Sequence, residues 1–132
     1  MRYVIDASVA AEYLLRTSLG LRASELIEGA SLLAPELLDV EVFSVLRRAV
    51  LKKKLEEQRA LMALEDLTAW EIDRIPHTVL TQEAWQFRHN VSAYDAFYVS
   101  AARIYNAPLL TADGPLSKTT NIGIVIQNIR IV

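Results

Sequence analysis

Short apolar segments alternate with helical segments along almost the whole chain, and this alternation limits the possible folds more than any other feature. The expected strands are short apolar runs at residues 3–5, 31–34, 71–75, 108–111 and 123–126. The expected helices follow 3.6-residue spacing at residues 8–16, 21–28, 36–55, 57–70, 81–88 and 94–105, with Ser8 as the first N-cap. Strands joined through helices pair in parallel, with helices on both faces of the sheet. We therefore predict an α/β fold around a central parallel sheet of about five short strands.

The chain has the size and composition of one folded domain. It contains 132 residues, 52% of them hydrophobic, with a mean hydropathy of +0.21, which excludes a disordered chain. No repeat, low-complexity tract or linker interrupts it. We expect residues 1–132 to form a single domain.

Charge and residue usage exclude several classes of protein. The net charge of −2 and pI of about 5.7 argue against a general nucleic-acid coat but leave room for a local basic groove. The absence of cysteine excludes disulfides and thiolate metal sites, and two histidines are too few for a His-rich zinc site. Asp6 and Glu12 interrupt the apolar N-terminal stretch, which makes it a poor signal peptide. No uncharged run approaches the roughly 18–20 residues that span a bilayer. We expect a soluble cytoplasmic protein without membrane contact.

Four acidic residues stand where the surrounding pattern is apolar. Asp6 follows the first strand, Asp113 follows the strand at 108–111, Asp95 lies in the first turn of the helix at 94–105, and Glu41 lies among apolar residues of the helix at 36–55. Taken singly, each has a structural explanation, as a turn residue, a helix cap or an exposed helix edge. Taken together, they lie at matching ends of successive elements, where parallel sheets form their ligand sites. The sequence therefore favours one acidic cluster.

Such a cluster requires neutralisation. At about 5 Å separation and an effective dielectric near 20, each adjacent pair of carboxylates repels by roughly 3 kcal/mol. Several such pairs would approach the whole stability of a domain, about 5–15 kcal/mol. Bound protons or divalent cations must offset the repulsion, and hard oxygen ligands select Mg²⁺ or Mn²⁺.

A carboxylate-held Mg²⁺ or Mn²⁺ favours phosphodiester hydrolysis by metal-activated water. The sequence offers no competing nucleophile: Ser8 has no adjacent histidine base, and neither a G-x-S-x-G elbow nor a glycine-rich phosphate loop occurs. We therefore predict direct attack by water.

Four segments together resemble a known family. They are "YVIDAS" at 3–8, "APELLDVEVFSVLRR" at 34–48, "AYDAFYVSAA" at 93–102 and "LLTADGPL" at 109–116. The ordered set resembles the PIN domain, and most closely the VapC-type toxins of prokaryotic toxin–antitoxin pairs. The resemblance matches the acidic quartet of that family to Asp6, Glu41, Asp95 and Asp113. It matches the small hydroxyl positions, which orient water or acids around the metal, to Ser8 and Thr111.

The resemblance implies an activity and partners. It implies a Mg²⁺- or Mn²⁺-dependent endoribonuclease that acts as a homodimer. It also implies a cognate VapB-type antitoxin that lays a helix or an extended segment over the acidic groove. Glu36 and Asp39 lie near Glu41, but the spacing from Pro35 and the following "VFSVLRR" favour Glu41. Many relatives carry an acid or aromatic soon after the last acid, where this chain has "GPL" at 114–116, so one or two metals remain possible.

Three other functions compete with the toxin. A PIN-like RNA-processing nuclease that is not a toxin would carry the same acids, and a PIN-like binding module would grip RNA without cleaving it. A phosphoryl-acceptor receiver domain expects paired acids after the first strand, whereas Asp6 stands alone there.

Several further residues have a structural and a functional interpretation. The basic run Arg47, Arg48, Lys52, Lys53 and Lys54 fits a solvated helix face better than a track for RNA phosphates. The aromatic residues Tyr94, Phe97 and Tyr98 could stack on bases, with Phe97 expected in the core. The apolar residues Val9, Tyr13 and Leu14 fit the core as well as an antitoxin groove. We expect His77 and His89 at the surface.

Overall fold

The central feature of the fold is a five-stranded parallel sheet. The computed structural model describes residues 1–119 and 122–131. Its strands are β1 (Arg2–Ile5), β2 (Ser31–Pro35), β3 (Asp73–Ile75), β4 (Leu109–Thr111) and β5 (Ile126–Asn128). They pair in the order β3-β2-β1-β4-β5, and every pairing is parallel. The predicted α/β class and the five parallel strands are confirmed.

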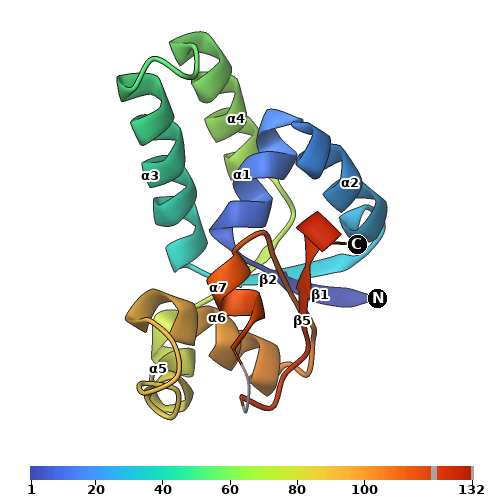
Figure 1. Ribbon diagram of the computed structural model, residues 1–132, viewed down its shortest axis with the longest axis vertical. Helices are drawn as coiled ribbons and strands as arrows, with labels where there is room; N and C mark the ends of the chain where they lie inside the picture. The colour runs from blue at the N-terminus through green and yellow to red at the C-terminus, as the bar shows by residue number, and fades with distance from the viewer. Residues whose placement is uncertain (120–121, 132) are drawn as a thin grey trace.

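Helices cover the sheet on both sides. They are α1 (Ala7–Leu15), α2 (Ser18–Ile27), α3 (Leu37–Leu51), α4 (Glu57–Ala69), α5 (His77–Trp85), α6 (Ala93–Ile104) and α7 (Gly114–Ser117), followed by a 3₁₀ turn at Ile129–Ile131. Figure 1 shows α1 to α4 on one side of the sheet and α5 and α6 on the other. Within the described residues, none of these helices combines the length and the apolar character needed to cross a bilayer.

The first helix begins differently from the expectation, because Asp6 and not Ser8 is its N-cap. The backbone of Asp6 is extended (φ −97°, ψ 175°), and its carboxylate accepts a hydrogen bond from the N–H of Val9 at 3.1 Å. An extended residue directly after a strand can turn its side chain onto the first helical turn, whereas Ser8 already lies inside that turn. The prediction of Ser8 as N-cap was wrong.

Two further helix boundaries differ from the expected ones. α2 begins at Ser18, three residues early, because the hydroxyl of Thr17 accepts a hydrogen bond from the N–H of Gly20 at 3.0 Å and caps the helix there. α3 ends at Leu51 and not near Leu55, because Lys53 adopts a left-handed backbone with φ of 59°. The chain then turns directly into α4.

The elements α5 and β5 also begin at other residues than expected. α5 begins at His77, not at residue 81, because β3 ends at Ile75 and the next residue, Pro76, cannot donate to a strand ladder and precedes the first helical turn. β5 covers Ile126–Asn128 and not residues 123–126, because Gly123 has φ of 70°, which is incompatible with an extended strand. Neither shift changes the topology.

The two central strands position the residues that follow them. Val4, Ile5, Leu109 and Leu110 are completely buried, and Ile5 pairs with Leu110 across the β1–β4 ladder. The next residue along each strand therefore lies at the same edge of the sheet, although 105 positions separate them along the chain. This register brings the ends of β1 and β4 together.

Candidate active site

Four acidic side chains from four segments line one pocket at the carboxyl ends of the strands. Asp6 directly follows β1, and Asp113 lies just beyond β4. Glu41 lies in α3, which follows β2, and Asp95 lies in the first turn of α6. All four border a cavity of about 300 Å³, together with Ser8. The structure thus brings the four predicted acids together, each from a different element.

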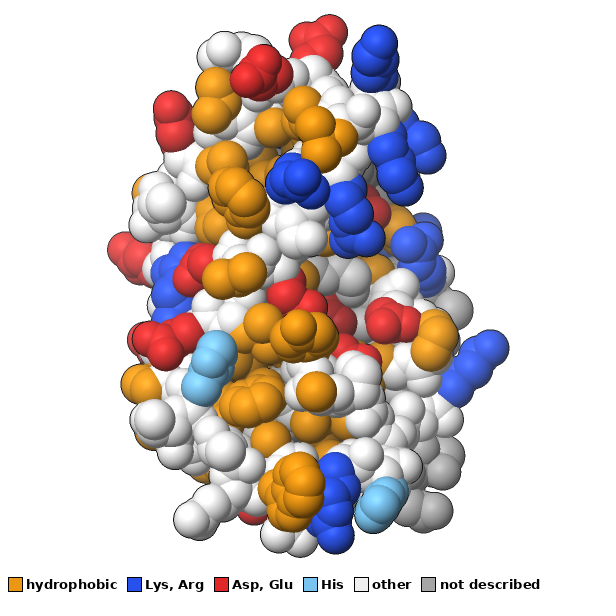
Figure 2. All heavy atoms as spheres, turned by 90° about the vertical axis from the view of Figure 1, so that its left-hand side faces the viewer, with side chains coloured by type: hydrophobic (Ala, Val, Ile, Leu, Met, Phe, Trp, Pro, Cys, Tyr) orange, Lys and Arg blue, Asp and Glu red, His pale blue; other side chains and the backbone are white. Residues whose placement is uncertain are grey.

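Charged side chains are unevenly distributed over the face shown in Figure 2. Acidic side chains lie near the middle of this face, with lysine and arginine side chains above and beside them. The local charge is therefore far from uniform, although the net charge of the whole chain is only −2.

Asp6 is the most enclosed of the four, with 5% of its surface exposed. Its Oδ1 accepts hydrogen bonds from Ser8 Oγ at 2.6 Å and from the N–H of Val9 at 3.1 Å, and its Oδ2 accepts from Thr111 Oγ1. Burial raises the pKa of Asp6 to about 6, although these hydrogen bonds lower it. The carboxyl group is thus fixed in orientation, while its charged form is destabilised unless a cation offsets the burial.

Ser8 and Thr111 connect the ends of β1 and β4 through their hydroxyl groups. Ser8 Oγ accepts a hydrogen bond from the N–H of Ala112 at 2.9 Å, and Thr111 Oγ1 accepts from the N–H of Asp113, also at 2.9 Å. Both hydroxyls donate to Asp6. The backbone after β4 therefore orients each hydroxyl, and the hydroxyls orient the carboxylate.

Tyr98 holds Glu41 from the opposite side of the pocket. Its ring is almost fully buried in α6, with 1% of its surface exposed, and its hydroxyl donates to Glu41 Oε1 at 2.7 Å. Burial and the Glu41 carboxylate raise the pKa of Tyr98 far above its usual value, so the phenol stays protonated and remains a donor. Burial also raises the pKa of Glu41. This hydrogen bond links α3 to α6 across the site.

Asp95 and Asp113 complete the acidic wall. Burial raises the pKa of Asp95, and repulsion from Asp113 raises it further, against a lowering hydrogen bond from Ser92. The charge of Asp95 also raises the pKa values of Asp6 and Glu41. Asp113 caps the short helix α7 through a long contact of 3.5 Å with the N–H of Leu116. Repulsion between the acids thus connects all four of them.

Of the two alternatives to Glu41, one is occupied elsewhere. The carboxylate of Asp39 binds the guanidinium of Arg74 through both of its oxygens, with Nε to Oδ2 at 2.9 Å. Glu36 is exposed at the start of α3 and makes no side-chain capping bond. Neither acid borders the pocket.

The pocket includes five residues that the sequence interpretation did not assign to it. They are Ala7, which directly follows Asp6, and Ser44, Val45, Arg48 and Tyr98. Three of them follow Glu41 at offsets of 3, 4 and 7 along α3, and Tyr98 follows Asp95 at an offset of 3 along α6. Such offsets place residues on the same face of a helix. Helical spacing from the predicted acids was therefore the signal that could have found them.

The other singled-out residues are mostly structural. Phe97 is half-buried against the core, Val9 and Leu14 are buried, and Tyr94 is exposed. His89 is exposed as expected, but the prediction for His77 was wrong. His77 is half-buried, and its Nε2 accepts a hydrogen bond from the N–H of Leu37 at 2.8 Å, which helps to cap α3.

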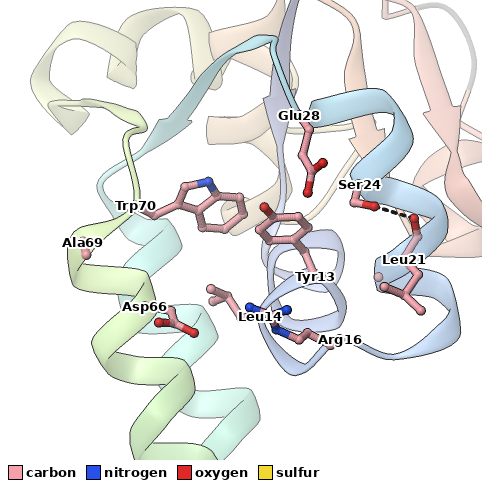
Figure 3. Close-up of a pocket in the computed structure, with 10 residues that line it drawn as sticks. Tyr13, Leu14, Arg16, Leu21, Ser24, Glu28, Asp66, Ala69 and Trp70 are labelled. Atoms are coloured by element: carbon pink, nitrogen blue, oxygen red, sulfur yellow. Dashed lines mark hydrogen bonds between the residues drawn. The ribbon is translucent and has the colours of Figure 1, made fainter.

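A second cavity lies between α1, α2 and α4. It has a volume of about 270 Å³ and includes none of the four acids. Figure 3 shows Tyr13 facing Trp70, with the ring centroids 4.8 Å apart and an interplanar angle of 16°. Arg16 and Asp66 lie at its edge. The cavity combines a stacked aromatic pair with charged surroundings.

The donor set of the acidic pocket fits a hard divalent cation. Four carboxylates and the Ser8 hydroxyl supply only oxygen, the ligand type that Mg²⁺ and Mn²⁺ prefer, whereas the buried Thr111 does not border the pocket and acts on it through Asp6. Burial without a paired cation raises the pKa of three of the acids, which a bound cation would reverse. Among the described residues, no three acidic or histidine side chains already surround a common ion position. The type of donor thus fits a hard cation, whereas the carboxylates are spaced around the pocket and not gathered about one point.

The chain is similar to known proteins along most of its length. Residues 3–121 match the family model described as the PIN domain. Ribonuclease VapC1 of Mycobacterium tuberculosis is 43% identical over 98 residues, which cover 74% of each chain.

Solved structures share the fold. The crystal structure of Mycobacterium tuberculosis VapC20, described as a Sarcin-Ricin loop cleaving toxin, has a TM-score of 0.65 at 19% identity and covers 93% of this chain and 96% of that one. A structure of VapBC2 from Rickettsia felis, bound to a DNA fragment from its promoter, has a TM-score of 0.58 at 18% identity and covers 97% and 98% of the two chains. At these identities the structures support the fold alone.

Proposed function

This chain belongs to the PIN domain family, as a ribonuclease of the VapC type, and we propose the following chemistry for its site. It hydrolyses RNA phosphodiester bonds as an endoribonuclease that depends on Mg²⁺ or Mn²⁺. Asp6, Glu41, Asp95 and Asp113 bind the metal directly or through water. Residues 1–132 act as one nuclease domain in the cytoplasm, where the RNA is.

The convergence of the four acids in one pocket carries this proposal. They come from four elements, and the described part of the chain provides no acid-to-lysine or acid-to-arginine ion pair for any of them. A bound Mg²⁺ or Mn²⁺ would supply a Lewis acid that polarises the phosphate and activates the attacking water.

The residues around the acids prepare them for this role. Ser8 and Thr111 keep both oxygens of Asp6 in one orientation, so little reorganisation is needed on binding. Tyr98 does the same for Glu41. A carboxylate held in advance loses less conformational freedom when it binds a cation or a water.

The partners follow from the family. We infer a VapB-type antitoxin that covers the acidic pocket, and a homodimeric toxin in its absence. A structural neighbour described as VapBC2 bound to promoter DNA supports such a pair. The cavity with the Tyr13–Trp70 stack offers an anchoring point for an antitoxin segment, because aromatic rings with polar edges are enriched at interfaces.

A metal titration with labelled RNA tests the activity. Purified protein is incubated with a panel of end-labelled single-stranded and looped RNAs while Mn²⁺ is added, and the products are separated on a gel. We expect cleavage that requires Mn²⁺ and is lost in Asp6→Asn. The matched control is Asp73→Asn, which removes the same charge at an exposed position of β3. RNA binding without Mn²⁺-dependent cleavage would identify a binding module in place of the nuclease.

The toxin assignment needs a separate test. Expression of the chain in a bacterial host should arrest growth, and co-expression with its antitoxin should restore it. A chain that cleaves RNA without arresting growth would be an RNA-processing nuclease.

A further inference from the structure

Among the described residues, one basic side chain lines the acidic pocket. Arg48 borders the same cavity as the four acids. It follows Glu41 by seven residues and Ser44 by four along α3, so the three lie on one face of the helix. Seven residues of helix rise by about 10 Å, so Arg48 stands at the rim of the pocket while Glu41 lies within it.

The positive charge of Arg48 is not used inside the protein. Its side chain is exposed, and no carboxylate of the described residues lies within 4.0 Å of its guanidinium. Its one hydrogen bond is a long contact of 3.5 Å from Nε to the carbonyl oxygen of Ser44 in the same helix. An arginine that neutralised the acids would pair with one of them, as Arg74 pairs with Asp39. Arg48 therefore remains available to an external anion.

We propose that Arg48 binds a phosphate of the RNA, next to the phosphate on which the metal-loaded acids act. This inference rests on the proposed nuclease function and deepens it. A guanidinium presents a planar set of donors that matches two phosphate oxygens, and it stays charged at any physiological pH. The acidic pocket repels the RNA backbone, so a cation at its rim supplies attraction where the substrate enters.

Arg47 provides a matched control. It directly precedes Arg48 in α3, is also exposed, and carries the same charge. It borders a different surface, the apolar groove between α3 and α4 that includes Phe43, Leu46 and Leu61. Arg47→Ala and Arg48→Ala thus change net charge and helix propensity equally and differ only in the surface that loses the guanidinium.

The salt dependence of RNA binding tests the inference. A fluorescein-labelled short single-stranded RNA of mixed sequence is titrated with each variant in the presence of Ca²⁺, at several KCl concentrations, and a gel confirms that the RNA stays intact. We expect Arg48→Ala to bind about tenfold more weakly at low salt. Its slope of log affinity against log salt should fall by about 0.7, the value for one lost contact to a single strand. Arg47→Ala should bind as the wild type does.

A second measurement excludes a structural role. Mn²⁺ binding to the free protein, followed by calorimetry, should be as tight in Arg48→Ala as in the wild type or tighter, because a repelling charge is gone. Weaker Mn²⁺ binding in Arg48→Ala would mean that Arg48 organises the acids, and it would overturn the inference. Equal RNA affinities and slopes for the two variants would overturn it too, as would a failure of the wild type to bind RNA.

The outcomes separate this inference from the proposed function. If the wild type cleaves RNA with Mn²⁺ but binding does not depend on Arg48, the nuclease stands and the inference fails. If RNA binding depends on Arg48 but no Mn²⁺-dependent cleavage occurs, the nuclease fails and with it the reacting phosphate beside Arg48, and only the contact of Arg48 with an RNA phosphate stands.

Discussion

Two acids of α3, only two residues apart, have opposite surroundings. Asp39 binds Arg74 through both carboxylate oxygens at 2.9 to 3.2 Å, whereas Glu41 has no lysine or arginine within 4.0 Å among the described residues. Arg74 also donates to the carbonyl oxygens of Leu67 and Trp70 and so satisfies the end of α4. The Arg74 cluster is complete without any external group.

The acidic pocket, in contrast, has no such cation paired with its acids among the described residues. Its charges are held in place by hydroxyl groups and not by cations, and burial raises the pKa values of Asp6, Glu41 and Asp95. An acid with its own cation thus stabilises the fold, whereas an acid fixed only by neutral donors is prepared for a cation from outside. Four experiments test this contrast.

The largest effect is expected from Asp6→Asn. The substitution removes the most buried charge of the pocket, so Mn²⁺-dependent RNA cleavage should fall by about a hundredfold or more. The free energy of unfolding without metal should stay the same or rise at neutral pH, because repulsion and desolvation are relieved. Quantitative cleavage assays and urea unfolding measure the two effects. Undiminished cleavage would remove Asp6 from the site.

A pH dependence of stability follows from the raised pKa of Asp6. Its pKa is 3.8 unfolded and about 6 folded, so the folded state holds the proton more tightly. The contribution of the Asp6 proton to the free energy of unfolding is therefore full below about pH 4. It is lost as the pH rises through 6, which lowers the free energy of unfolding by about 3 kcal/mol. The raised pKa values of Glu41 and Asp95 act in the same direction.

Urea unfolding across this pH range, with a chelator and then with Mn²⁺, measures the effect. Asp6→Asn is the reference, because it removes the titration, and the difference between the two proteins isolates Asp6. Mn²⁺ should restore stability at neutral pH and have little effect near pH 4. If the free energies of unfolding of the wild type and Asp6→Asn differed by the same amount at every pH, the contrast between the acidic pocket and the Arg74 cluster would be contradicted.

Arg74→Ala should affect the other region. It removes a bidentate ion pair and two helix-end hydrogen bonds, so the free energy of unfolding should fall by about 2 kcal/mol, reduced from a fully buried value because both side chains are partly exposed. Mn²⁺ affinity should not change, as calorimetry below the melting temperature can verify. A loss of Mn²⁺ affinity as large as the loss of stability would mean that the two regions are coupled.

The smallest effect is expected from Tyr98→Phe. The ring stays buried, so stability should change little, but Glu41 loses the hydroxyl that orients it and Mn²⁺ affinity should fall by about threefold to tenfold. The control is Tyr94→Phe, which removes an exposed hydroxyl from the same helix. If both variants bind Mn²⁺ as the wild type does, Tyr98 serves packing alone.

Much of the fold was predictable, because each strand is a short apolar run between helices. The order of the strands was not, since no local pattern tells which runs pair. The closeness of Asp6 and Thr111 depends on the β1–β4 register, which joins residues 105 positions apart. The ion pair between Asp39 and Arg74 is equally non-local and left no signal in the sequence.

The acids of the pocket could be found from their apolar neighbours, but its basic rim could not. α3 exposes Val40, Phe43 and Leu51, so its apolar residues do not mark one buried face. The basic residues after them therefore looked like one solvated run, although Arg47 and Arg48 border different surfaces. Tertiary packing, and not the local sequence pattern, fixes the rotation of α3 about its axis.

The position of Asp6 has a consequence for genetics. Its carboxylate accepts a hydrogen bond from the N–H of Val9 and so caps the N-terminus of α1, in addition to lining the pocket. In a selection for chains that no longer cleave RNA but still fold and accumulate, asparagine at position 6 should appear far more often than alanine, because asparagine still caps a helix and alanine does not. Inactive natural descendants of such a chain should carry the same bias, so an asparagine there would mark a silenced copy and not a damaged one.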